Sequence, residues 1–281
     1  MSMDFAYWVR RFEEAEAERA RTPDPAWGTG GPLPVALVAS LQRFQTGEDG
    51  DGASLLGKSA RAGDAHYLAA VRMFVAEEQR HARLLERVLA EAGATTIAGH
   101  WTDSVFVFVR RAFGLRLELM TLMVAEVVAL RYYRALRDSA PHSLLRDVAG
   151  RILHDEERHV PFHVARLRQG LGRLPWAVRV AVASAWWVLM LGATLVVAVG
   201  HAGALRRLAL SPAQFAADVA LLFRPVVRAV LGPAGHSRPS GAVSKAGDIG
   251  PHTHEHVGAG HANTGPACGG GAAHRIQRDR P

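Results

Sequence analysis

Two copies of the pattern Glu-x-x-His carry the strongest chemical signal in this sequence. They lie in Glu77-Glu78-Gln79-Arg80-His81 and in Asp155-Glu156-Glu157-Arg158-His159. On an α-helix this spacing puts a carboxylate and an imidazole almost one turn apart on the same face, so both side chains can reach one point. Such a pair of donors is typical of a metal site.

A single Glu precedes each motif at the same distance. Glu48 lies 30 residues before Glu78, and Glu126 lies 30 residues before Glu156. Two matches to so short a motif are weak evidence for a metal site on their own. The equal spacing of the preceding Glu residues and the acid before each motif Glu strengthen that evidence. The chain therefore indicates one helix pair used twice. Four Glu and two His projecting inward are the donors that two adjacent metal ions require.

Glu126 is the most informative single residue, because it interrupts the apolar run 122–130. An ionised carboxylate is costly to bury there unless it is paired or bound to metal. The alternative is a buried salt bridge to Arg72 or Arg80. For the two Glu-x-x-His motifs the alternative is a solvated helix face, since Glu and Arg are abundant around both.

Hydrophobic periodicity predicts an all-α chain, with short loops between antiparallel neighbours. The expected helices cover 4–21, a segment opening at Val35, Asp64 to about Leu89 with Gly93 just beyond its end, about 102–138, and His142 to about Gln169. Residues 47–52 have poor helix propensity. Asp49 and Asp51 are therefore the alternatives to Glu48 as the donor of this segment.

On these residues the sequence resembles the ferritin-like superfamily of di-iron carboxylate proteins, such as rubrerythrins, the small ribonucleotide reductase subunit and di-iron oxygenases. The resemblance spans about 33–170 and implies a ferritin-like four-helix bundle with two Fe ions, Mn or a mixed Fe/Mn pair being the alternatives. It implies single-Glu ligands, bridging or terminal carboxylates, imidazole ligands, and acids that hydrogen-bond the far nitrogen of each His. The single-Glu ligands would be Glu48 and Glu126, and the bridging or terminal carboxylates Glu78 and Glu156. The imidazole ligands would be His81 and His159, and the acids that hydrogen-bond them Glu77 and Asp155.

The resemblance also implies a function. The first hypothesis is a di-iron oxidoreductase that activates O2, takes electrons from a donor and oxidises an apolar organic substrate that the sequence does not identify. The alternatives are a ferroxidase or iron-handling stress protein, a di-manganese catalase, and a helical scaffold or membrane-docked bundle without metal. The scaffold predicts that the inward Glu residues pair with Arg.

Residues 180–200 contain no charged side chain. Their helix would rise roughly 30 Å, enough to cross a bilayer core. Two interpretations remain open, a helix packed against the bundle or a homodimer partner, and a membrane contact. A last amphipathic helix is expected at about 211–231. We divide the chain into an N-terminal docking helix and loop (1–32), the bundle (33–170), an apolar helical extension (171–234) and a disordered Gly/His-rich tail (235–281).

Composition excludes several classes of protein. The formal charge is +7, but the Arg residues are scattered among Glu rather than gathered in a stripe, which argues against a nucleic-acid partner. Cys268 is the only cysteine, so a disulfide within the chain or a thiolate metal site is excluded. Met1 to Arg21 lacks the features of a secretory signal. We expect a cytoplasmic protein, associated with a membrane only if 180–200 makes that contact.

Some polar residues have a simpler interpretation than chemistry. His154 and His163 flank the second motif, and we interpret His163 as a hydrogen-bonded helix histidine rather than a third imidazole ligand. Tyr132 and Tyr133 are assigned to core packing rather than to a radical site. The tail histidines belong to a solvated low-complexity segment; they are His252, His254, His256 and His261.

Overall fold

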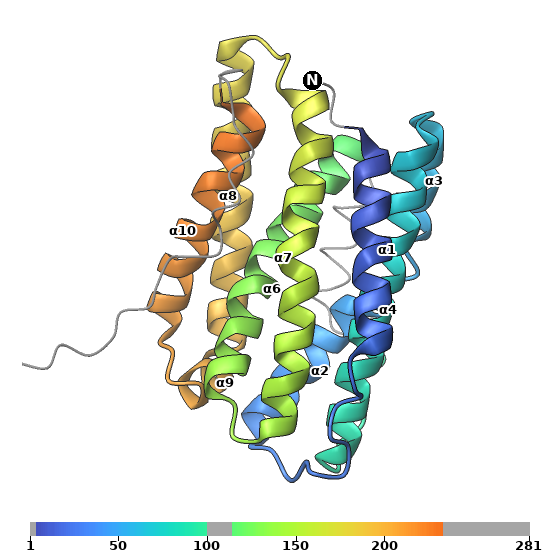
Figure 1. Cartoon of the computed structure of the whole chain (residues 1–281). Coiled ribbons are helices and arrows are strands. Elements are labelled where there is room, and N and C mark those ends of the chain that lie inside the picture. The colour runs from blue at the N-terminus through green and yellow to red at the C-terminus, as the bar shows by residue number, and fades with distance from the viewer. Residues whose placement is uncertain (1–3, 100–113, 233–281) are drawn as a thin grey trace, which may run out of the picture. The chain divides into compact units, whose positions relative to one another are not determined.

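The computed structural model describes residues 4–99 and 114–232, and within these ranges all regular structure is helical. The prediction of an all-α fold is confirmed. Four long helices form two hairpins that lie side by side (Figure 1). They are α2 (Val35–Glu48), α4 (Ala65–Glu91), α6 (Leu115–Ser139) and α7 (Ser143–Leu171).

The ends of α4 follow from the sequence. The Asp64 carboxylate accepts a hydrogen bond of 2.9 Å from the Tyr67 backbone N–H, which satisfies one free donor of the first turn. Gly93 stands just past the other end with φ +72°, a conformation that favours glycine. Both predictions are confirmed. The predicted start of the next helix, near residue 102, lies outside the described residues.

The chain breaks directly after Glu48, the last residue of α2, and restarts as α3 (Ala53–Arg61). Gly52 makes the turn with φ +64°, and a Cβ there would lie 2.6 Å from the methyl groups of Val75 on α4. Only glycine fits both the conformation and the close approach. The sequence indicated the weak helix propensity of this stretch but did not predict α3.

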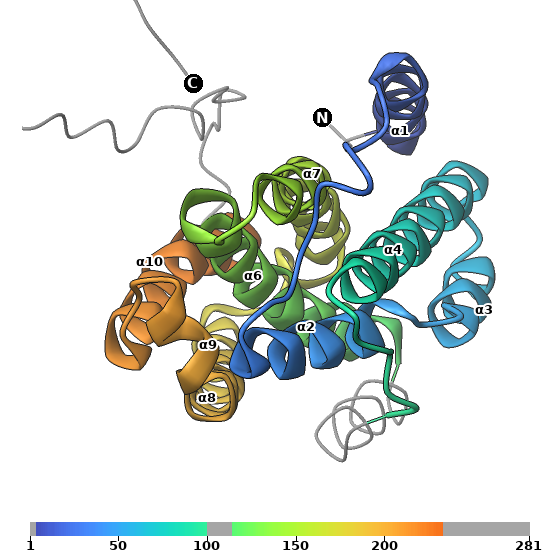
Figure 2. The same ribbon diagram turned by 90° about the horizontal axis from the view of Figure 1, so that it is seen from below.

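Helix α1 (Phe5–Arg21) lies on the outside of the hairpins and packs on α4 (Figure 2). Its buried face consists of Phe5, Trp8, Phe12 and Ala15. Phe12 meets Phe162 of α7 edge to face, with 5.3 Å between ring centroids. The helix is therefore anchored to both motif-bearing helices.

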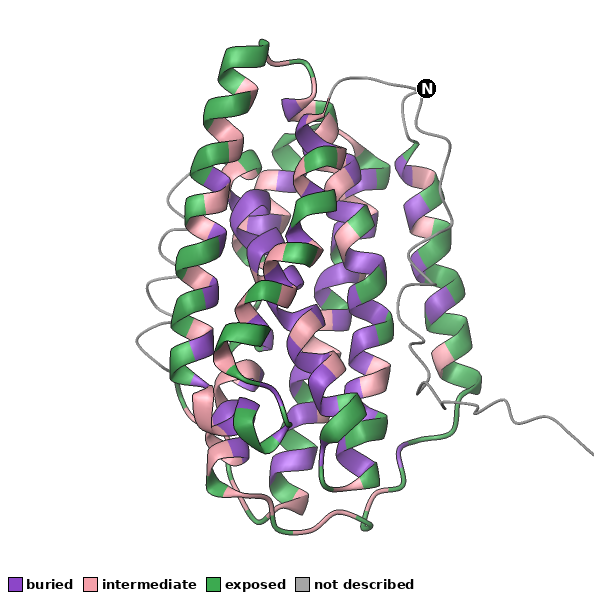
Figure 3. Ribbon diagram, turned by 90° about the vertical axis from the view of Figure 1, so that its left-hand side faces the viewer, coloured by how far each residue is buried: buried purple, intermediate pink, exposed green. Residues whose placement is uncertain are grey.

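Three further helices follow the bundle: α8 (Trp176–Gly200), α9 (Ala202–Arg207) and α10 (Pro212–Leu231). α8 packs on α6 and α10 through one stripe, in which the Trp186 indole donates a 2.9 Å hydrogen bond to the Met120 carbonyl. Its other faces are apolar and largely exposed (Figure 3). Among the described residues, α8 alone is long and apolar enough to cross a membrane, by length and composition. Membrane contact stays a prediction.

Candidate metal centre

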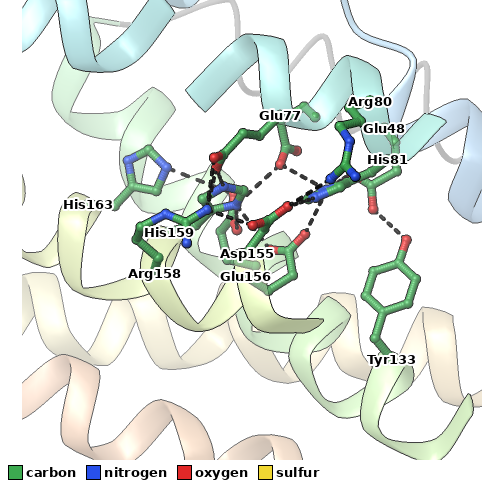
Figure 4. Close-up of polar contacts among 12 residues, drawn as sticks. Glu48, Glu77, Arg80, His81, Tyr133, Asp155, Glu156, Arg158, His159 and His163 are labelled. Carbon is green, nitrogen blue, oxygen red and sulfur yellow. Dashed lines mark hydrogen bonds and ion pairs between the residues drawn. The ribbon is translucent and has the colours of Figure 1, made fainter. Parts of the chain in front are cut away.

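The structure brings all six predicted donors together between the helices of the bundle (Figure 4). They form two groups that share Glu78 and Glu156, and the donor atoms of each group lie within 4.8 Å of one another. Glu48 and His81 complete the first group, and Glu126 and His159 complete the second.

In each group an imidazole nitrogen faces three carboxylates. His81 Nδ1 lies 3.3 Å from Glu156, 3.6 Å from Glu78 and 3.9 Å from Glu48. His159 Nδ1 lies 3.3 Å from Glu78, 3.4 Å from Glu156 and 3.5 Å from Glu126. The shared carboxylates thus lie between the two imidazoles, where each could bridge two ions.

Burial makes this cluster unusual. His81 and His159 are fully buried, Glu126 and Glu156 nearly so, and the Glu78 side chain is 18% exposed. Four buried atoms that face the cluster have no hydrogen-bond partner among the described residues: Glu78 Oε1, His81 Nδ1, Glu126 Oε2 and His159 Nδ1. Unsatisfied buried polar atoms cost free energy, and metal coordination satisfies them. The donor set therefore fits two divalent cations.

The pKa values respond to this crowding. Burial raises the pKa of Glu78 to about 8, with help from the charges of Glu48 and Glu156. Burial and the same kind of repulsion raise the pKa of Glu126 well above its ordinary range. Burial opposes the charged form of His81 and His159, but the surrounding carboxylates outweigh it and raise both pKa values. Protons here supply the positive charge that divalent ions would otherwise supply.

The acids Glu77 and Asp155 accept hydrogen bonds from the Nε2 atoms of the two imidazoles, and each acid binds the histidine of the other motif. His81 Nε2 donates to Asp155 over 3.2 Å, and His159 Nε2 donates to Glu77 over 2.8 Å. Each acid thus belongs to one motif and orients the histidine of the other. Such hydrogen bonds fix the tautomer that leaves Nδ1 free for a metal.

Two arginines close this outer layer. Arg19 of α1 lies 2.6 Å from Glu77 and 3.0 Å from Asp155. Arg158 lies 2.8 Å from Glu77 and 2.6 Å from Asp155. Despite the cost of burial, the pKa of Asp155 falls below its ordinary range, because His81 and these arginines favour the charged form. Arg19 was not predicted, since it is one of several arginines on α1. The available signal was that Glu77 and Asp155, two acids close together, need cations beside them.

Glu48 is the donor for which the sequence offered two alternatives, Asp49 and Asp51. Its carboxylate accepts a 2.5 Å hydrogen bond from Tyr133, whereas Asp49 and Asp51 are exposed. Asp51 accepts instead from the Ala53 backbone N–H at the start of α3. The structure therefore brings Glu48, rather than either substitute, to the cluster.

The arginine alternative for Glu126 does not hold in the described structure. The imidazoles nearest to it are His159 at 3.5 Å and His163 at 3.8 Å, and neither Arg72 nor Arg80 pairs with it. Arg80 lies 3.7 Å from Asp155 instead. Arg80 thus joins Arg19 and Arg158 around the outer acid Asp155.

Our interpretation of His163 as a hydrogen-bonded histidine is wrong. The residue is fully buried, and within the described chain neither ring nitrogen has a hydrogen-bond partner. Burial, together with the charge of His159, lowers the pKa of His163 to about 3, so its ring is neutral. His154, by contrast, is exposed, and the Tyr132 hydroxyl lies 2.7 Å from Ser40 Oγ in the core.

The predicted resemblance to ferritin-like proteins is confirmed at the level of the fold. Solved structures of an R2-like ligand-binding oxidase share the fold. A variant with an anaerobically reconstituted Mn/Fe cofactor matches with TM-score 0.61 and 14% identity, covering 79% of this chain and 93% of that chain. The same oxidase without metal cofactor matches with TM-score 0.57 and 14% identity, covering 79% and 96%. No protein-family model and no curated protein matches this chain.

Proposed function

We propose that this chain is a di-metal oxidoreductase that activates O2. The observation that carries the proposal is the pair of buried donor groups that share Glu78 and Glu156. Two redox-active ions bound there would supply the binding and reduction of O2. The structurally similar oxidase is described with a Mn/Fe cofactor, which fits a donor set of carboxylates and imidazoles. We propose Fe, with Mn or a mixed pair as the alternatives.

The protein's own contribution is to position donors and exclude water. Glu77 and Asp155 orient the two imidazoles, and Arg19 and Arg158 hold those acids in their charged form. Phe74 lies edge to face against His159, with 4.7 Å between ring centroids. Such an enclosure keeps donor geometry fixed while metal charge changes.

We propose an apolar organic compound as the substrate, oxidised with electrons from an external donor. Two observations support this. The side chains around the donors are apolar and buried, among them Phe74, Met123 and Val127. The similar solved structures are named ligand-binding oxidases.

The exposed apolar face of α8 supports a second, separate proposal, contact with a membrane surface or with a second copy of the chain. That face includes Val188, Leu191, Leu195 and Val199. A cytoplasmic location, with membrane association through α8, stays part of this proposal.

O2 uptake tests the proposed function. The full chain is loaded anaerobically with Fe(II), with Mn(II) or with both, and is then exposed to O2 with and without a reductant and apolar carbon compounds. We expect uptake by the wild type, none by Glu156→Ala, and wild-type behaviour from Glu157→Ala, which changes the exposed neighbour. Equal uptake by all three contradicts the proposal. Uptake that repeats with each Fe(II) addition and builds a ferric mineral favours the iron-handling alternative.

A further inference from the structure

His163 sits directly behind the second donor group. It follows His159 by four residues on α7, so the two imidazoles lie on the same helix face, one turn apart. Its ring packs edge to face on Phe74, with 4.7 Å between centroids, and against Phe162 at 5.0 Å. Figure 4 shows the ring beside that of His159, at the edge of the cluster.

The surroundings of His163 do not explain why it is a histidine. Both ring nitrogens are buried without a hydrogen-bond partner among the described residues, and such a state costs free energy. An apolar side chain would fill the same space without that cost. The first half of the molecule shows this, because the equivalent residue four positions after His81 is Leu85, which is also fully buried.

The direction of the ring points to a partner. His163 Nε2 lies 3.8 Å from Glu126 Oε1, while His159 Nδ1 lies 3.5 Å from Glu126 Oε2. The two imidazoles therefore approach the two oxygens of one carboxylate. A neutral imidazole nitrogen beside a carboxylate and a second imidazole is a metal-ligand arrangement rather than a packing one.

We propose that His163 is a second imidazole ligand of the metal position formed by Glu126 and His159. This inference rests on the proposed di-metal function and makes the two positions unequal, with two imidazoles at one and a single imidazole, His81, at the other. Nitrogen ligands favour Fe(II) over Mn(II), in line with the general affinity order of divalent metals. The Glu126 position should therefore take Fe(II) preferentially from a mixture.

The test compares the wild-type full chain with His163→Leu, which introduces the residue that the first half carries. His154→Leu is the matched control, since it removes an exposed histidine from the same helix. Metal content after anaerobic loading with Fe(II) or Mn(II) is measured by elemental analysis, with Glu156→Ala as the baseline for any metal held by the tail. We expect His163→Leu to keep one ion and to bind the other at least about 100-fold more weakly, with the control unchanged.

A second measurement does not depend on how the variant folds. Pulsed EPR on the metal-loaded wild type, with and without 15N-labelled histidine, counts the imidazoles coupled to the centre. Three support the proposal, and two overturn it. Unchanged affinity for both ions in a folded His163→Leu also overturns it. A wild type that takes up no stoichiometric metal overturns the proposed function, and this inference with it.

Discussion

The two halves of the centre repeat the same donors, yet they differ in what stands around them. Glu48 ends α2, next to the glycine turn, and takes a hydrogen bond from Tyr133. Glu126 lies in the middle of α6, where its Oε2 has no hydrogen-bond partner among the described residues and two imidazoles, those of His159 and His163, lie nearby. One half is bounded by a helix end and a tyrosine, and the other is enclosed by apolar side chains and His163. The comparison teaches that repeated motifs do not give two donor groups the same surroundings.

The largest effect should come from removing the single-Glu donors one at a time. Glu126→Leu should abolish one metal ion and stabilise the metal-free protein, because it removes a buried carboxyl whose Oε2 has no hydrogen-bond partner among the described residues. We expect the melting temperature of the metal-free protein to rise by about 2–4 °C for each kcal/mol recovered.

Glu48→Leu should abolish the other ion without that gain, since it strands the buried Tyr133 hydroxyl. Metal content and calorimetry on the two variants check both expectations. If Glu126→Leu melts below the wild type in the absence of metal, the two halves do not differ in the way described.

An intermediate effect is expected at Arg19, which contacts the outer acids of both halves. Arg19→Ala should weaken both metal ions by about 10–100-fold, the usual consequence of losing a residue that orients metal ligands. Arg21→Ala, at an exposed position on the same helix, is the control. Competition with a metal chelator measures both affinities. Weakening of one ion only would show that α1 supports a single half.

The smallest effect is the pH dependence of the metal-free protein. His81 and His159 have raised pKa values, and that of Glu78 is raised to about 8. Stability from these protonated forms is complete below their ordinary pKa values and is lost as pH rises through the raised values. The melting temperature of the metal-free protein should therefore start to fall as pH rises above the ordinary Glu pKa of 4.5 and should keep falling up to about 8, where the Glu78 contribution ends. It should fall less with metal bound.

Glu78→Gln separates this contribution from general alkaline unfolding. The amide cannot lose a proton, so the part of the decline that belongs to Glu78 should disappear. A decline of the same size in the variant would assign the pH dependence to other groups.

The fold and the meeting of the six donors could be predicted because both rest on local pattern. Helix periodicity, the Asp64 cap and the equal spacing of Glu48 and Glu126 are read along the chain. The outer contacts could not be predicted in this way. Arg19 reaches Glu77 and Asp155 only through the docking of α1, and the crossed hydrogen bonds depend on how α4 and α7 face each other.

His163 and α3 show two further limits. A histidine four residues beyond a ligand is usually satisfied by a nearby group, and only the packed structure reveals that neither nitrogen is. The restart at Ala53 depends on Gly52 fitting against Val75, a contact between distant segments of the chain. For residues 180–200, composition could not separate a packed helix from a membrane helix, because α8 buries one stripe and exposes the rest.

Anomalous diffraction from crystals of the full chain, loaded anaerobically with Mn(II) and Fe(II), tests the central claim most directly. Data collected on both sides of the Mn and Fe absorption edges locate and identify each ion. We predict two peaks that share Glu78 and Glu156, one beside Glu48 and His81 and the other beside Glu126 and His159. The absence of both peaks, with the carboxyl groups paired to one another or to arginine, would contradict a di-metal centre.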